Sequence, residues 1–157
     1  MTNLTDSEKR TLERAKRILT KIMENSAVYD NCVKAFTQPE LSKFFVRNEI
    51  GLSEREEFLV LFLNTGNELQ SKEILFRGTV NEAAIYPREI VKRALELNSS
   101  AIIIAHNHPS GSLEPSREDI AITKKIKSAC DLLTIKLLDH IIVSAKGAVS
   151  LAEQGYL

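Results

Sequence analysis

Residues Ala101-Ile-Ile-Ile-Ala-His-Asn-His108 decide how the rest of the chain is arranged. The continuous apolar run Ala101–Ala105 has the length and composition of a strand that is covered on both faces. It leads directly into His106 and His108, two of the three histidines in the chain. Because alternate residues of a strand share a face, this spacing can direct both imidazoles to one side. The stretch therefore predicts a buried strand with two metal-binding rings at its end.

A helix is predicted to begin at Ser116 and to run to about Asp131. Asp119 lies one helical turn after Ser116, so both side chains lie on one side at the helix start. Two imidazoles and a carboxylate suit zinc, and three protein ligands leave a fourth position for water, as in catalytic zinc sites. We expect one zinc ion per chain, held by His106, His108 and Asp119. The alternative is that Ser116 and Asp119 only cap the helix.

The remaining pattern predicts a mixed α/β sheet with helices packed on it. A second continuous apolar run, Phe58–Leu63, indicates another doubly covered strand. In the helix that begins near Thr37, we expect Leu41, Phe44 and Phe45 to form the buried face. The other elements are strands at residues 69–77, 135–143 and 148–151, and helices at residues 37–51 and 87–97.

An additional amphipathic helix is predicted from Thr5 to about Asn25. Thr5 and Glu8 have the spacing of a capping box, and apolar residues recur at helical intervals behind them. We therefore expect two parts, an accessory N-terminal helix within residues 1–30 and a metal-binding domain over residues 31–157. The apolar stripe of the helix could dock on its own domain or on a second copy, which would make a homo-oligomer.

Composition excludes several classes of protein. The 157 residues suffice for one domain with a substantial core, and 21 basic residues balance 21 acidic ones. Nucleic-acid binding by bulk charge is therefore unsupported. No apolar run approaches the roughly 20 residues of a membrane helix, and residues 1–10 lack the apolar stretch of a secretory signal. Cys32 and Cys130 stand alone, so we expect a cytoplasmic protein without a membrane partner.

The string His106-x-His108, seven residues, Ser116, two residues, Asp119 resembles the JAMM motif of the MPN (JAB) metallopeptidases without a gap. The resemblance covers roughly residues 36–157 and implies an MPN/JAB-like fold, a cytidine-deaminase-like mixed β-sheet flanked by helices. RadC proteins commonly carry an N-terminal helix-hairpin-helix region, whereas only one helix is predicted here, so the chain resembles a short form. The context that resembles the RadC branch is Gly78-Thr-Val-Asn81, Pro87-Arg-Glu89, Ala105–Gly111, Pro115–Asp119 and Asp139-His-Ile-Ile-Val143.

The resemblance also implies catalytic roles. Ser116 would hydrogen-bond the attacking water or the developing oxyanion. A glutamate just ahead of the aromatic residue that opens the strand would be the general base, and Glu56-Glu57-Phe58 fits this pattern. We favour Glu56, with Glu57 as the alternative, because a slip of one residue would place the other glutamate on the same face.

Four further residues are candidates for supporting the ligands: Asn107, Ser110, Asp139 and His140. Neighbours on a strand point to opposite faces, so only one of Asp139 and His140 can face the metal, where it would orient a ligand imidazole. The alternative is a purely structural role.

The implied function is zinc-dependent hydrolysis of a peptide or isopeptide bond by a zinc-activated water, with a peptide or protein as substrate. The alternative is a non-catalytic MPN-like interaction module or a DNA-repair accessory protein. The adjacent letters His-Asn-His do not indicate an HNH nuclease, in which these residues are spread over a ββα unit. A zinc deaminase is excluded because the chain has no Cys-x-x-Cys pair.

Overall fold

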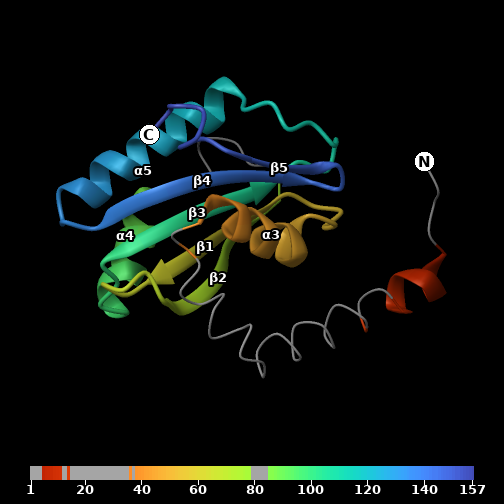
Figure 1. Ribbon diagram of the computed structural model, residues 1–157, viewed down its shortest axis with the longest axis horizontal. Helices are drawn as coiled ribbons and strands as arrows, with labels where there is room; N and C mark the ends of the chain where they lie inside the picture. The colour runs from red at the N-terminus through yellow and green to blue at the C-terminus, as the bar shows by residue number, and fades with distance from the viewer. Residues whose placement is uncertain (1–4, 12–13, 15–35, 37, 79–84) are drawn as a thin grey trace.

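The computed structural model describes residues 5–11, 14, 36, 38–78 and 85–157 of the chain. Within these ranges, five strands form one mixed sheet in the order β2-β1-β3-β4-β5 (Figure 1). The predicted mixed α/β class is therefore confirmed. The strands are β1 (Glu57–Leu63), β2 (Leu69–Arg77), β3 (Ala101–Asn107), β4 (Lys136–Ser144) and β5 (Gly147–Ser150). The helices with defined bounds are α3 (Pro39–Ile50), α4 (Pro87–Glu96) and α5 (Arg117–Asp131).

The two continuous apolar runs become the central neighbours β1 and β3, which pair antiparallel with Phe58 opposite His106 and Leu63 opposite Ala101. β3 and β4 pair in parallel, whereas β2 pairs antiparallel with β1 and β5 pairs antiparallel with β4. Parallel strands need a crossover connection, and here α5 supplies it. The crossover begins where β3 ends and leads into α5. The first turn of α5 lies beside that end of the strand, where Asp119 contacts His106.

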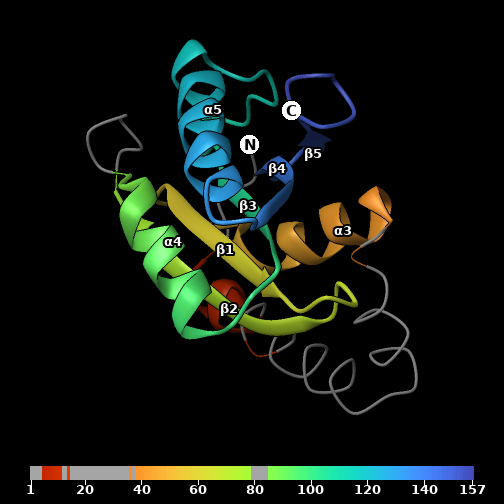
Figure 2. The ribbon, with the colours of Figure 1, turned by 90° about the vertical axis from the view of Figure 1, so that its left-hand side faces the viewer.

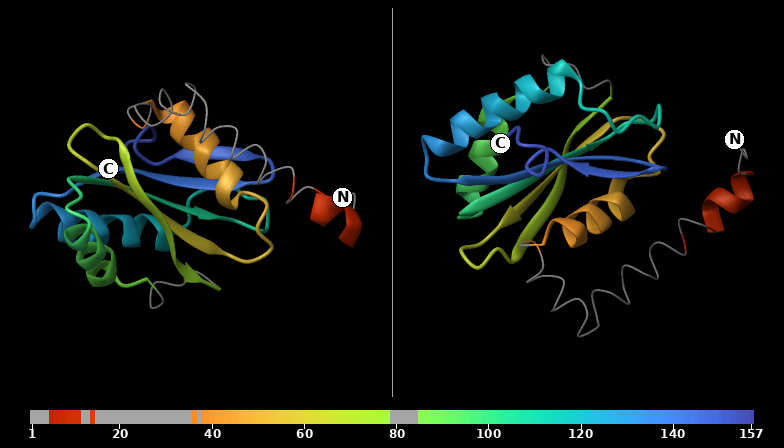
Figure 3. Two further views of the ribbon diagram at one scale, coloured as in Figure 1. Left: turned by 90° about the horizontal axis from the view of Figure 1, so that it is seen from below. Right: turned by 45° about the horizontal axis from the view of Figure 1, so that its top comes forward.

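Both faces of the central strands are covered, as their unbroken hydrophobicity predicts. Val60 and Ile104 belong to the core that packs against α4 and α5. Leu61 and Ile103 belong to a second core on the α3 side, and Figures 2 and 3 show these helices on the two sides of the sheet. Because residues alternate along β3, His106 lies on the face of α4 and α5.

The buried face of α3 differs from the prediction. Phe44 is 54% exposed, so its assignment to the buried face is wrong. It lies about 200° around the helix from Ser42, the first buried residue of the helix. Leu41 and Phe45 lie beside the buried residues and are half-buried. The buried residues of the helix are spaced by four: Ser42, Val46 and Ile50.

The described part of the N-terminal segment begins with the expected capping box. Thr5 N donates to Glu8 Oε2 at 2.7 Å, Glu8 N donates to Thr5 Oγ1 at 3.4 Å, and residues 6–11 are helical. The rest of the predicted helix lies outside the described residues, so the division near residue 30 stays a prediction. Among the residues that the structure describes, no helix has the length and hydropathy needed to cross a membrane.

Candidate metal centre

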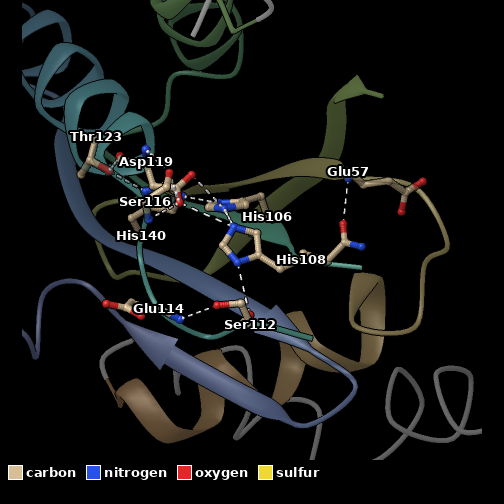
Figure 4. Close-up of polar contacts among 10 residues, drawn as sticks. Glu57, His106, His108, Ser112, Glu114, Ser116, Asp119, Thr123 and His140 are labelled. Atoms are coloured by element: carbon tan, nitrogen blue, oxygen red, sulfur yellow. Dashed lines mark hydrogen bonds and ion pairs between the residues drawn. The ribbon is translucent and has the colours of Figure 1, made fainter. Parts of the chain in front are cut away.

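Three predicted ligands converge where β3 ends and α5 begins (Figure 4). His106 is the last residue but one of β3 and is fully buried. His108 follows the strand, and Asp119 lies in the first turn of α5. His106 Nε2 is 2.9 Å from His108 Nε2 and 3.1 Å from Asp119 Oδ1. One donor atom from each residue lies within 4.8 Å of the others. The three side chains are therefore positioned to bind a metal ion.

The start of α5 fixes the carboxylate of Asp119. Its Oδ2 accepts from Ser116 N at 2.8 Å and from Ser116 Oγ at 2.7 Å, and Asp119 N donates back to Ser116 Oγ at 3.0 Å. This reciprocal pair is a capping box, which satisfies N–H groups that the helix cannot pair. The capping and the metal interpretation of these residues are thus compatible, because the box leaves Oδ1 directed at His106.

A backbone carbonyl fixes the ring of His108. His108 Nδ1 lies 3.2 Å from Ser112 O, and a carbonyl oxygen can only accept. Nδ1 therefore carries the proton, and Nε2 presents its lone pair toward the other ligands. Ser110, a predicted supporting residue, lies in the same loop and accepts from Ser112 N through its Oγ at 3.4 Å.

The ring of His106 is held from β4. His106 Nδ1 is 2.9 Å from His140 Nε2, and His140 is fully buried. On its other side, His140 Nδ1 contacts Thr123 Oγ1, which also hydrogen-bonds the backbone carbonyl of Asp119. Burial, followed by the positive charge of a protonated His106, lowers the pKa of His140 well below its usual value. His140 is therefore a neutral ring at physiological pH.

Asp139 points to the other side of β4. Its Oδ1 accepts from His140 N at 2.7 Å and from Ala152 N at 3.1 Å, which ties the turn after β5 to the strand. Of the two neighbours considered from the sequence, the structure places His140, not Asp139, against a ligand imidazole.

Asp119 supplies the negative charge of the ligand cluster. Burial alone would raise the pKa of Asp119, but its contacts with the His106 and His108 rings outweigh this effect and hold the pKa far below its ordinary value. The hydrogen bond with Asp119 raises the pKa of His108 against the opposing effect of burial, and the charge of Glu56 raises it further. A carboxylate that stays ionised between two imidazoles is suited to a cation.

The two candidate glutamates lie on opposite sides of the strand. Glu56 precedes β1, and its carbonyl accepts from Gly78 N at 2.9 Å, which extends the pairing with β2. Its charge reaches His108, whose pKa it raises. Glu57 is directed toward Arg77, with 3.4 Å between its Oε1 and the Arg77 Nε. Because neighbouring residues of a strand alternate in direction, the two side chains take opposite faces, and the role of Glu56 as a base stays a prediction.

Asn107 lies between the two histidines of the motif but faces away from them. Its Oδ1 accepts from Glu57 N at 2.8 Å. Its Nδ2 donates to Ser53 O at 3.1 Å and to Arg55 O at 3.0 Å. Asn107 thus holds the segment that carries Glu56 rather than a ligand ring.

Two contributors to the site were not predicted from the sequence. Thr123 lies one turn after Asp119 on the buried face of α5, and this i+4 spacing from a ligand is the signal that could have revealed it. The carbonyl of Ser112 carries no side-chain signal at all.

Comparison with known proteins agrees with this geometry. Residues 36–156 match the sequence model of a family described as RadC-like JAB domain. A UPF0758 protein of Methylibium petroleiphilum is 44% identical over 146 residues, which cover 93% of this chain and 63% of the relative. UPF0758 proteins of Actinobacillus pleuropneumoniae and Actinobacillus succinogenes are 44% and 48% identical over 144 and 122 residues. These alignments cover 92% and 78% of this chain, and 62% and 56% of the relatives.

This chain spans less than two thirds of the length of these relatives. The matched family region nevertheless includes every strand of the sheet and the three side chains that are positioned to bind a metal. The resemblance seen in the sequence is confirmed: the chain belongs to the RadC-like JAB domain family.

Proposed function

We propose that this chain is a zinc-dependent hydrolase that cleaves a peptide or isopeptide bond. The observation that carries the proposal is the convergence of two imidazoles and one carboxylate within 4.8 Å at the end of β3. JAB domains as a class include metallopeptidases, as the resemblance of the motif implies.

The donor set fits a metal ion on chemical grounds. His108 Nε2 is an acceptor because Nδ1 donates to Ser112 O. The Asp119 carboxylate is also an acceptor, and its Oδ2 lies 3.5 Å from that nitrogen. Two acceptors that face each other repel unless a proton or a cation lies between them. Zinc accepts this mixture of imidazole nitrogen and carboxylate oxygen, so we assign one zinc ion per chain to these ligands.

A zinc ion held there would lower the pKa of a water molecule to about 7 and polarise the oxygen of a carbonyl group. Glu56 accepts a proton from the attacking water as its oxygen bonds to the amide carbon. When the carbon–nitrogen bond breaks, Glu56 returns that proton to the leaving amine. Proton transfer is thus balanced within one catalytic cycle.

Ser116 stabilises the oxyanion in this proposal. Its Oγ proton is donated to Asp119 Oδ2 in the structure, 2.7 Å away. Asp119 Oδ2 also accepts from Ser116 N, so the carboxylate keeps one capping bond when the hydroxyl turns toward substrate. A donor directed at developing negative charge is a large contribution in acyl-transfer catalysis.

The test combines metal analysis with a hydrolysis assay on the same preparations. We expect about one zinc per chain in the wild-type protein and loss of that zinc in His106→Ala and Asp119→Ala. New amino groups are then measured with unfolded protein and with lysine-linked isopeptides as substrates. Unchanged zinc content in both variants would refute the ligand assignment. Full zinc loading without any release of amines would instead favour the non-catalytic interaction module.

A further inference from the structure

We infer that Thr123 and His140 form a relay that fixes the tautomer of His106, so that Thr123, which hydrogen-bonds a backbone carbonyl and His140, is a positioning residue for the metal centre. The inference rests on the proposed function only in that it takes His106 as a ligand. The order of the protons follows from the contacts of the described side chains (Figure 4).

The relay starts at the backbone carbonyl of Asp119. Thr123 Oγ1 contacts this carbonyl oxygen and also His140 Nδ1. A carbonyl has no proton to give, so the hydroxyl of Thr123 donates to it. If Thr123 donated to His140 Nδ1 instead, its Oγ1 and the carbonyl oxygen of Asp119 would face each other without a proton between them. With its only proton used, Thr123 Oγ1 accepts a hydrogen bond from His140 Nδ1.

The second step is set by the burial of His140. The side chain is fully buried, and its two nitrogens face a hydroxyl and another imidazole rather than a carboxylate. Burial of a charged ring without an anionic partner is costly, so the neutral ring is favoured. Its single proton lies on Nδ1, which leaves Nε2 as an acceptor. His106 Nδ1, 2.9 Å away, must therefore donate.

The third step delivers the lone pair to the metal centre. Since Nδ1 of His106 holds the proton, its Nε2 is proton-free and faces Asp119 Oδ1 at 3.1 Å. His108 reaches the same state by a shorter route, because Nδ1 of its ring faces the carbonyl of Ser112 directly. Both ligands thus present Nε2. The tautomer of His108 is set by a single carbonyl, whereas that of His106 is set by a carbonyl, a hydroxyl and a second imidazole.

Without the Thr123 hydroxyl, the proton of His140 would no longer be held on Nδ1. His140 could then move its proton to Nε2 and donate to His106 Nδ1. His106 would in turn carry its own proton on Nε2, where it competes with the metal. Loss of a group that orients a ligand imidazole typically weakens metal affinity about 10- to 100-fold.

The test uses Thr123→Val, which keeps the shape of the side chain, and Thr123→Ser, which keeps the hydroxyl. Zinc affinity is measured by competition with a chelator, and we expect about 10- to 100-fold weaker binding in Thr123→Val and recovery in Thr123→Ser. Ile126→Val is the matched control, because it trims a buried side chain on the same helix without removing a polar group. Its zinc affinity should equal that of the wild-type protein.

The second readout is the nitrogen-15 spectrum of the histidines in metal-free protein, recorded well above the ordinary histidine pKa of about 6.5. We expect a protonated Nδ1 and a proton-free Nε2 for His140 in the wild type, and redistribution toward a protonated Nε2 in Thr123→Val. A wild-type His140 protonated on Nε2, or a Thr123→Val spectrum identical to wild type, would overturn the relay. Should the wild type show the expected tautomer yet bind no zinc, the relay stands and the proposed hydrolase falls.

Discussion

Phe58 of β1 and His106 of β3 lie opposite each other in the central strand pair, with their rings stacked at a centroid distance of 6.3 Å and an interplanar angle of 8°. Because alternate residues of a strand share a face, continuing this register carries Glu56 toward His108. Glu57 takes the opposite face, where it approaches Arg77. The register of two buried strands thus favours Glu56 over Glu57 as the predicted general base.

The two glutamates can be separated by the same substitution at neighbouring positions. Glu56→Gln should keep its zinc, because this carboxylate is not a ligand, and should lower hydrolysis by about 10²- to 10⁴-fold, the usual contribution of a general base. Glu57→Gln is the matched control and should retain both zinc and activity. Rates are compared at equal zinc loading. A loss of activity confined to Glu57→Gln would assign the base to that residue.

The stability of the metal-free protein should fall as the pH rises through the folded-state pKa of His108. The hydrogen bond with Asp119 raises this pKa above its ordinary value, against the effect of burial. A histidine with a raised folded pKa stabilises the fold fully below its unfolded pKa of about 6.5, and this contribution disappears as the pH rises through the folded pKa.

Urea unfolding with a chelator present measures this contribution as the difference between the wild-type protein and His108→Gln. The comparison cancels the titration of shared groups that lie far from His108. We expect the advantage of the wild-type protein to shrink with rising pH. An advantage that grows over that range would contradict the ion pair between His108 and Asp119.

Much of this architecture was predictable because it is encoded in local pattern. The unbroken apolar runs Phe58–Leu63 and Ala101–Ala105 predict doubly covered strands, and they became neighbours at the centre of the sheet. The spacing of His106 and His108 is likewise local, since two alternate residues at a strand end share a face. These features do not depend on knowing which distant segment packs against them.

The features that were not predictable depend on long-range packing or on backbone groups. Phe44 resembles a core residue in the sequence, but the stripe of α3 that meets the sheet begins at Ser42, so Phe44 faces outward. Thr123 reads as a polar interruption of an apolar face until β4 brings His140 against it. The link from Ser112 to His108 runs through a backbone carbonyl, which any residue at that position would supply.

Asn107 should influence hydrolysis without influencing zinc binding. Its side chain makes three hydrogen bonds to backbone groups of the segment that carries Glu56. Asn107→Ala leaves these groups without their partner, so we expect a loss of about 1–3 kcal/mol in the free energy of unfolding and reduced hydrolysis at normal zinc content. Ser110→Ala, in the loop after β3, is the control and should change stability little. Zinc loss in Asn107→Ala would show that the residue supports the ligands instead.

Asp139 should influence stability without influencing the metal. It accepts from His140 N at 2.7 Å and Ala152 N at 3.1 Å, and Asp139→Ala leaves both groups without this acceptor. We expect a loss of about 1–3 kcal/mol in urea unfolding and an unchanged zinc affinity in chelator competition. Asp139→Asn keeps one acceptor oxygen and should recover most of the stability. Zinc binding weakened about tenfold at normal stability would instead mean that Asp139 acts on a ligand imidazole, which would shift the supporting role from the His140 ring to the adjacent carboxylate.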